Sequence, residues 1–190
     1  MLLPIVAYGD PILKEHGCSI NADYPNLDAL ISNMYETMYN SKGVGLAAHQ
    51  VGLPIRLFII DCSPFNEEEP ALINFKKTFI NAEILKEEGE EWLFNEGCLS
   101  IPDIREEVSR KPKISLRFFD EKFVEHTEVY EGISARVIQH ELDHTNGILF
   151  TDYLSSLRKT TLKRRLRDIM TGNISPGYRM RFPKIKKGKK

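Results

Sequence analysis

The most informative segment of this sequence is SARVIQHELDHTNG, residues 134–147. It contains the motif HExxH, with His140 and His144 at positions i and i+4. On a helix these side chains lie one turn apart on the same face, so both imidazoles can bind one metal ion. We therefore predict a helix over about residues 134–145, with its first serine as the N-cap and Gly147 just past its end.

Glu141 follows the first histidine of the motif and is rotated from it by about 100° on a helix. A carboxylate in this position serves as the general base of a metal-dependent hydrolase and does not bind the metal itself. The alternative is a solvated helix face that bears two histidines and an acid. The preceding turns are apolar, so we expect the helix to be buried and its histidines to need polar partners. Those apolar residues are Ile133, Ala135, Val137 and Ile138.

A catalytic metal site usually has three protein ligands and one open position, so a third ligand must come from elsewhere in the chain. The extended pattern HExxHxxGxxH needs a histidine where this sequence has Phe150. The acids that follow the motif, Asp152 and Asp168, belong to no convincing motif. Cys98, in NEGCLSIP at 95–102, is the remaining candidate, because a thiolate and two imidazoles suit Zn²⁺ or Fe²⁺.

The composition is that of one globular domain. The chain has 190 residues, of which 42% are hydrophobic and 28% are charged. Its apolar runs are too short to cross a membrane, and its first residues lack the basic region of a signal peptide. Three cysteines argue against a disulfide framework. We therefore expect a cytoplasmic protein with no membrane partner.

The net charge of −1 hides a strong asymmetry. Residues 158–190 hold 13 of the 26 lysines and arginines and one acid, which makes this segment +12 and the rest of the chain −13. The acidic part is not expected to bind DNA. The basic segment is either a solvated end or a surface that binds phosphates by releasing counterions.

Hydrophobic patterns predict further elements along the chain. We expect a helix over 26–40, capped by Asn26 or Asp23, and a strand over 55–61. An acidic loop around Glu67 to Pro70 should be exposed. The remaining expectations are one or two strands within 77–94 broken at Gly89, a hairpin of 113–120 with 123–130, and a basic helix over about 154–170. Strands gathered before the motif helix predict an α+β fold with antiparallel sheets.

Three segments resemble, in order, the motifs of the peptide deformylase family: GVGLAAHQ at 43–50, EGCLS at 96–100 and QHELDH at 139–144. The opening LPIVAYGDPIL is also similar to that family, and the resemblance covers about residues 2–155. It implies antiparallel sheets packed around a central helix that carries HExxH, followed by a basic C-terminal helix.

The resemblance also implies the reaction and its residues. One divalent metal ion would be held by Cys98, His140 and His144. Fe²⁺ is the implied physiological ion, with Zn²⁺, Ni²⁺ or Co²⁺ as substitutes. Glu141 would act as general base and then general acid, while the Gln50 amide and the Leu99 N–H stabilise the oxyanion. The substrates would be N-formylmethionyl nascent peptides, which lose the formyl group as formate.

The substrate site implied by the resemblance draws on three parts of the chain. Its residues are Val44, Gly45, Phe94, Gly97, Arg105 and Val137. The two residues from GVGLAAHQ would pair with a peptide that adds a strand to a sheet edge. For Arg105 a plain surface salt bridge is the alternative. Arg136 departs from the family, where its place is often apolar. Its stem would line the methionine pocket while its head reaches solvent.

Two other functions are compatible with HExxH. A metal peptidase would need a third histidine or a glutamate, which is missing, whereas Cys98 is available. A structural metal site in a binding module would need a fourth ligand, such as His49 or His126. We expect one catalytic domain over residues 1–170 and a basic, irregular tail over 171–190. Because the substrates emerge from the ribosome, the basic segment is a candidate for docking there.

Overall fold

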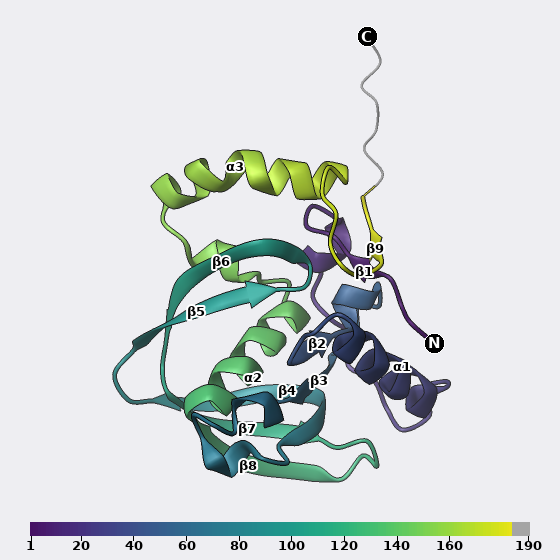
Figure 1. Ribbon diagram of the computed structural model, residues 1–190. Coiled ribbons are helices and arrows are strands. Elements are labelled where there is room, and N and C mark those ends of the chain that lie inside the picture. The colour runs from purple at the N-terminus through teal and green to yellow at the C-terminus, as the bar shows by residue number, and fades with distance from the viewer. Residues whose placement is uncertain (184–190) are drawn as a thin grey trace.

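Helix α2, Gly132–Thr145, lies between two β-sheets in the computed structural model, which describes residues 1–183 (Figure 1). One sheet has five antiparallel strands in the order β2-β3-β4-β7-β8, and the other is the antiparallel pair β5-β6. The antiparallel sheets expected from the sequence are therefore confirmed. The α2 helix contains the whole HExxH motif and is buried along most of its length.

The elements have the following bounds. The larger sheet consists of β2 (Gly45–Ala47), β3 (Leu57–Asp61), β4 (Lys76–Glu88), β7 (Lys113–Phe119) and β8 (Glu125–Glu131). The smaller one consists of β5 (Trp92–Cys98) and β6 (Ile101–Arg110). A short parallel pair joins β1 (Ile5–Val6) to β9 (Met180–Arg181). The other α-helices are α1 (Leu27–Asn40) and α3 (Ser156–Thr171). Short 3₁₀ helices span Pro11–Lys14, Ala48–Val51, Ser63–Phe65, Pro70–Leu72 and Phe150–Tyr153.

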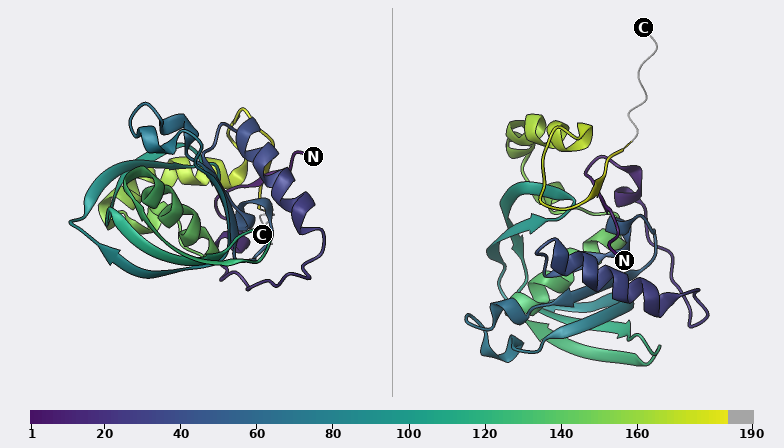
Figure 2. Two further views of the ribbon diagram at one scale, coloured as in Figure 1. Left: turned by 90° about the horizontal axis from the view of Figure 1, so that it is seen from below. Right: turned by 45° about the vertical axis from the view of Figure 1, so that its right-hand side comes forward.

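Strand β3 is covered by helices on both of its faces (Figure 2). Phe58 and Ile60 belong to the core cluster that contains α2, whereas Leu57 and Ile59 belong to the cluster that contains α1. All four side chains are fully buried. A strand buried on both faces has no polar face, which explains why its sequence is a continuous apolar run.

Several sequence predictions are confirmed by the structure. The helix over 26–40 and the strand over 55–61 form as expected. The predicted hairpin is the antiparallel pair β7-β8. Strands β4 and β5 are separated at Gly89, whose φ of 90° lies in the left-handed region that favours glycine.

The structure differs from the sequence analysis at three places. Asn26 precedes α1 in a left-handed conformation, and its side chain makes no capping bond. Helix α2 begins at Gly132, so Ser134 lies within the helix and its hydroxyl donates to the Glu131 carbonyl at 2.8 Å. Strand β6 was not predicted, because Pro102 near its start reads as a turn signal. The strand pairs only with β5 among the described residues, and a proline is tolerated on such an edge.

The C-terminal segment is more ordered than its sequence predicts. Residues 180–181 form β9 and pair with β1, because the apolar start of the chain offers a free strand edge. The lysine-rich end from Lys184 onward lies outside the described residues. Within residues 1–183 no helix combines the length and the apolar character needed to span a bilayer.

The acidic loop that follows β3 reaches the start of α2. The carboxylate of Glu69 accepts a hydrogen bond from the backbone N–H of Ile133 at 3.0 Å. The first N–H groups of a helix have no partners within the helix, and a negative charge there also opposes the positive end of the helix dipole. Glu69 therefore fulfils the capping function that was assigned to Ser134.

We expect Glu69→Ala to lower the free energy of unfolding by about 1 kcal/mol, the usual cost of losing a helix N-cap. Glu68→Ala is the matched control, since its exposed side chain makes no hydrogen bond or ion pair within residues 1–183. Urea denaturation monitored by circular dichroism measures both variants. Equal stability of the two variants would contradict a capping role for Glu69.

Candidate metal centre

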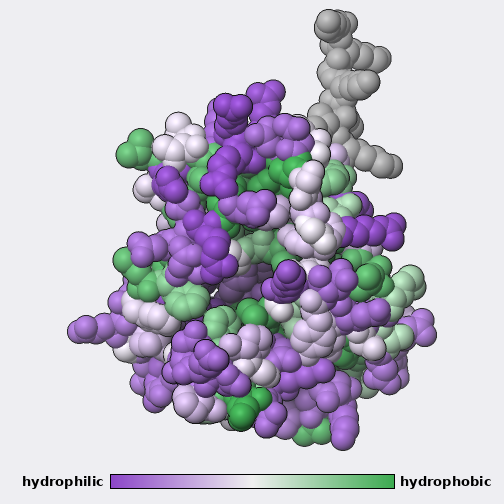
Figure 3. Space-filling view, viewed as in Figure 1, coloured by the Kyte–Doolittle hydropathy of each residue, from purple (hydrophilic) through white to green (hydrophobic). Residues whose placement is uncertain are grey.

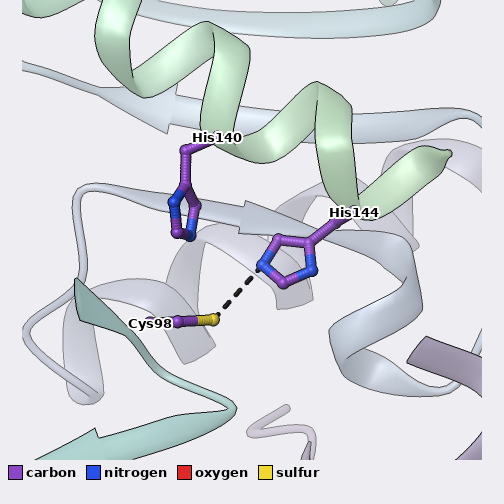
Figure 4. Close-up of side chains that lie close together, drawn as sticks. All are labelled: Cys98, His140 and His144. Carbon is purple, nitrogen blue, oxygen red and sulfur yellow. Dashed lines mark hydrogen bonds between the residues drawn. The ribbon is translucent and has the colours of Figure 1, made fainter. Parts of the chain in front are cut away.

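Cys98, His140 and His144 converge at one point (Figure 4). Both imidazoles extend from the same face of α2, and Cys98 lies at the end of β5. One ligand atom from each residue lies within 4.8 Å of the others, and the Cys98 Sγ is 3.2 Å from the His144 Nε2. Within residues 1–183, these three side chains form a group whose ligand atoms are close enough to hold one metal ion. Thiolate and imidazole donors at this spacing fit a divalent transition metal.

His49 and His126 do not join this group. The His126 Nε2 lies 3.0 Å from the Asp120 Oδ2, at the end of the larger sheet. His49 is fully buried beside Gln50, and burial lowers its pKa to about 4. Three side chains that could hold a metal ion match the number of protein ligands usual in catalytic sites, whereas closed structural sites usually have four.

The orientation of His140 is set by a buried carboxylate. Glu96 is 4% exposed, and its Oε2 lies 2.8 Å from the His140 Nδ1. A carboxylate at Nδ1 accepts the proton of that nitrogen, which leaves the Nε2 lone pair free to bind a metal. Glu96 and Cys98 lie on the same strand two residues apart, so alternation places both side chains toward α2.

Two arginines surround the same carboxylate. Glu96 accepts from the Arg110 Nε at 2.8 Å and from the Arg136 Nη1 at 2.9 Å. Arg110 also donates to Asp143, the fourth residue of the HELDH motif, at 2.7 Å. Burial raises the pKa of Glu96, but its hydrogen bonds with His140 and Arg110 outweigh this effect and hold the pKa well below its usual range. The carboxylate is therefore charged.

The expectation that the Arg136 head reaches solvent is wrong. Arg136 is 2% exposed, and its guanidinium donates to the carbonyls of Trp92 and Val108 at 2.7 and 2.8 Å. It also lies over the Trp92 ring, 4.7 Å from the centroid. Fixed acceptors on β5 and β6 hold the charged head inside the protein. Arg136 thereby joins both strands of the smaller sheet to α2.

Burial shifts the pKa values of the motif residues. It lowers the pKa of His144 well below the ordinary value, so this ring is neutral, the form that binds metals. For His140 burial acts in the same direction, but hydrogen bonds with Cys98 and Glu96 outweigh it and raise the pKa. Burial also raises the pKa of Glu141 to about 7.

Glu141 and Gln50 lie beside the ligand group. The Glu141 Oε2 is buried and has no hydrogen-bond partner among the described residues. A Cβ atom at Gly45 would lie 2.8 Å from the Glu141 Cγ, so the glycine is needed for this packing. Gln50 accepts from the Ala47 N–H at 2.8 Å, which fixes its amide so that Nε2 lies 3.4 Å from the Cys98 Sγ.

A cavity of about 500 Å³ opens in front of these groups. Figure 3 shows the face seen in Figure 1 hollowed near its centre. The cavity is lined by every residue expected in the substrate site: Val44, Gly45, Phe94, Gly97, Arg105 and Val137. Gln50, Leu99, His140 and Glu141 line it as well. Sequence motifs from three distant parts of the chain therefore meet at one cavity.

Arg105 does not form the surface salt bridge that was its alternative interpretation. Its guanidinium donates to the side chain and to the carbonyl of Asn95 at 2.6 and 2.5 Å. It lies across Gly97, where a Cβ atom would approach the Arg105 Nη1 to 2.8 Å. No carboxylate within residues 1–183 pairs with Arg105, so its charge faces the cavity mouth.

Sequence reasoning missed the supporting residues of this site. Glu96 carried a detectable signal, since it is an acid two positions before Cys98 and directly follows the segment 77–94 in which strands were predicted. Arg110 carried none, because its bonds to Glu96 and Asp143 span long sequence separations. The same holds for the segment Ser175–Tyr178, which lines the cavity from the end of the chain.

Comparisons with known proteins agree with this geometry. A family model described as polypeptide deformylase matches residues 2–160. The peptide deformylase of Flavobacterium johnsoniae is 58% identical, and the alignment covers 100% of each chain. The peptide deformylase of Cytophaga hutchinsonii is 48% identical over 98% of this chain and 100% of its own length.

Solved structures give the same result. A peptide deformylase from Legionella pneumophila superimposes with a TM-score of 0.79 at 32% identity, covering 91% of this chain and 98% of that one. A class I type b peptide deformylase from Acinetobacter baumannii, crystallised with Met-Ala-Ser bound, gives a TM-score of 0.75 at 34% identity. That alignment covers 81% of this chain and 99% of the other.

We expect Arg136→Met to lower the free energy of unfolding by about 3–5 kcal/mol, because it removes one partner of a buried carboxylate and the hydrogen bonds that two carbonyls accept from the guanidinium. Arg117→Met is the matched control. Arg117 pairs with Glu83 at 2.6 Å, but these side chains are 49% and 56% exposed, and such pairs contribute at most about 1 kcal/mol. Urea denaturation of both variants, with an unchanged m value, makes the comparison. Similar losses in the two variants would contradict the structural role of Arg136.

Proposed function

Because this chain belongs to the polypeptide deformylase family, we propose that Glu141, Gln50 and Leu99 carry out its reaction. The enzymes of this family are metal-dependent hydrolases, and this chain removes the formyl group from the N-terminal methionine of nascent polypeptides. The roles of individual residues are proposed from the geometry around the metal centre. The observation that supports them best is the convergence of Cys98, His140 and His144 beside Glu141.

We infer that Cys98, His140 and His144 hold the metal ion and that Fe²⁺ is the physiological ion. Zn²⁺, Ni²⁺ and Co²⁺ are expected substitutes, since all of them accept thiolate and imidazole donors. When bound, the divalent ion supplies Lewis acidity and lowers the pKa of water in the site. The neutral state of His144 and the Glu96 bond to His140 support this ligand set.

In the proposed mechanism Glu141 moves the proton. Its carboxylate accepts a proton from the attacking water as the water oxygen bonds to the formyl carbon. The Gln50 Nε2 and the Leu99 N–H donate hydrogen bonds to the carbonyl oxygen, which becomes negatively charged. Glu141 then protonates the amine nitrogen as the C–N bond breaks, and formate and a free N-terminus leave. A buried Glu141 with a pKa near 7 is suited to both tasks.

The peptide is proposed to bind between two strand edges. Strand β2 is at the edge of the larger sheet, and β5 pairs only with β6 among the described strands. Residues of both strands line the cavity, among them Gly45 and Gly97. An extended peptide can add to such an edge through main-chain bonds. Val44, Phe94 and Val137 would contact the methionine side chain, and Arg105 would face the following residues.

Formate release from formyl-Met-Ala-Ser tests the assignment, with protein purified without oxygen. We expect Glu141→Ala to lower kcat by about 10²- to 10⁴-fold while retaining the metal. Cys98→Ala should lose both the metal and the activity. Glu107→Ala, at an exposed position of β6, is the control and should match the wild type.

Elemental analysis of dialysed samples separates these roles. A Cys98→Ala variant with full metal content would contradict the ligand assignment. Undiminished turnover by Glu141→Ala would contradict its role as the base. A wild-type protein that contains metal and releases no formate would contradict the activity itself.

We also infer that residues 1–170 form one catalytic domain, built around α2 as its central helix, in a cytoplasmic protein. The family model match over residues 2–160 supports the domain. The contacts of Met180–Arg181 with β1 extend the packed part of the chain into the proposed basic tail, 171–190.

The ribosome is the proposed docking partner of the basic segment 158–190, in which α3 is the basic C-terminal helix. Three basic residues of this helix are already engaged within the protein. Arg158 pairs with Glu106 at 2.7 Å, Lys159 donates to the Asp152 carbonyl, and Arg165 donates to the Asp103 carbonyl. The side chains of Lys163, Arg164 and Arg167 make no hydrogen bond or ion pair within residues 1–183, so these three are the candidates for RNA phosphates.

The pairing of β9 with β1 determines how docking must be tested. Deleting residues 173–190 would remove β9, so charge reversal is the cleaner change. We expect Lys163→Glu/Arg167→Glu to reduce pelleting with ribosomes and to flatten its salt dependence. Lys111→Glu/Lys122→Glu, with the same change in charge on another face, is the control. A chain ending at Pro183 tests the lysine-rich end separately. Equal pelleting by all proteins would contradict docking through this segment.

A further inference from the structure

The two-residue connection between β5 and β6 accepts hydrogen bonds from two residues outside the hairpin, Tyr8 and Tyr178. This connection, Leu99–Ser100, directly follows the proposed ligand Cys98. The Tyr178 hydroxyl donates to the Leu99 carbonyl at 2.8 Å, and the Tyr8 N–H donates to the Ser100 carbonyl at 2.9 Å. Both carbonyls of the connection are therefore bonded to groups that do not belong to the hairpin.

The segment that supplies Tyr178 is itself fixed in place (Figure 1). Next to it, β9 runs parallel to β1, and the Ile5 N–H donates to the Arg179 carbonyl at 2.9 Å. Arg181 lies 3.7 Å from Asp10 and adds an ion pair. Tyr178 also packs in the same apolar cluster as Leu99. The tyrosine thus reaches the connection from a strand that is anchored on the N-terminal part of the chain.

Leu99 is confined on its side-chain side as well. A Cβ atom at Gly43 would lie 2.7 Å from the Leu99 Cδ1, so the two segments are in close contact. The residues Ser175–Tyr178 line the cavity together with Cys98 and Glu141. Leu99 lines the cavity and also accepts a hydrogen bond from Tyr178. A change in the position of Tyr178 can therefore change the position of the Leu99 backbone in the site.

We propose that Tyr178 is a positioning residue that fixes the Leu99 carbonyl, and through the backbone angles of Leu99 the preceding peptide group, so that the Leu99 N–H faces the developing oxyanion. The inference rests on the proposed role of the Leu99 N–H. The tyrosine does not touch the substrate carbonyl in this account. Its hydroxyl restricts rotation about the Leu99 backbone, and a donor that is fixed in advance stabilises the transition state without reorganising. The C-terminal segment is therefore part of the active site.

Tyr178→Phe removes the hydroxyl and keeps the ring. We expect kcat on formyl-Met-Ala-Ser to fall about 10-fold, less than the ~100- to 1,000-fold that follows complete loss of an oxyanion donor. KM should change by less than about 2-fold, because the donor acts mainly in the transition state. Metal content should remain that of the wild type.

Tyr130→Phe is the matched control. The Tyr130 hydroxyl donates to Glu128 at 2.7 Å on β8, the edge strand opposite β2 in the larger sheet, and neither residue lines the cavity, so the same atom is lost away from the site. This variant should retain the wild-type kcat. An unchanged kcat in Tyr178→Phe, or an equal fall in both variants, would overturn the proposal. Loss of metal from Tyr178→Phe would also overturn it, since the effect would then act on Cys98.

A measurement without turnover separates this inference from the proposed function. In protein loaded with Zn²⁺, which is diamagnetic, backbone ¹⁵N relaxation reports the mobility of the Leu99 and Ser100 amides directly. In Tyr178→Phe their order parameters should fall from the rigid range, about 0.85, toward 0.6, while those of α1 remain unchanged. Unchanged order parameters would overturn the positioning role even in an active enzyme. If the amides loosen but the wild type releases no formate, the proposed function fails and the positioning contact stands.

Discussion

The charge of Glu96, buried between α2 and the smaller sheet, is the constraint on which the rest of the site depends. An isolated carboxylate in this position would be costly by several kcal/mol, so it must have partners. Its partners come from β6 and from two places on α2: Arg110, Arg136 and His140. The same carboxylate therefore joins the smaller sheet to the helix and orients His140, a proposed metal ligand. Fold stability and ligand geometry are not separable here.

Some residues of the HELDH motif have proposed catalytic roles, and another one stabilises the packing of the helix. The two histidines are the proposed metal ligands and Glu141 lines the cavity, whereas Asp143 accepts from Arg110 and so connects the helix to the Glu96 group. The larger sheet contributes in another way. Its edge strand β2 brings Gly45 against Glu141, and the 3₁₀ helix after it positions Gln50. The cavity thus lies where two sheet edges and one helix meet.

The sequence predicts best those parts of the site that depend on short spacing. His140 and His144 are related by one helical turn, and their role follows from that spacing alone. Cys98 could be assigned because other candidates lacked a motif. The exposure of the Arg136 head was predicted wrongly, because the sequence does not show that carbonyls on β5 and β6 accept hydrogen bonds from it. Arg110 and Tyr178 could not be found, since each acts through contacts with residues distant in the chain.

The same reasoning applies to the fold. Amphipathic helices and the apolar β3 are evident from periodicity, because their burial is imposed by local patterns of side chains. Strand β6 was hidden by Pro102, which an edge position tolerates. The N-cap of α2 was also hidden, since Glu69 arrives from a loop more than sixty positions earlier in the chain.

The pairing of β1 with β9 has a consequence for biosynthesis. Translation proceeds from the N-terminus, so β1 is synthesised about 175 residues before its partner β9. Until residues 175–181 have been synthesised, β1 lacks the strand with which it pairs and the cavity lacks the lining segment Ser175–Tyr178. A nascent chain that has been elongated only to the end of α3 therefore does not have the complete cavity, although it already contains the proposed metal ligands.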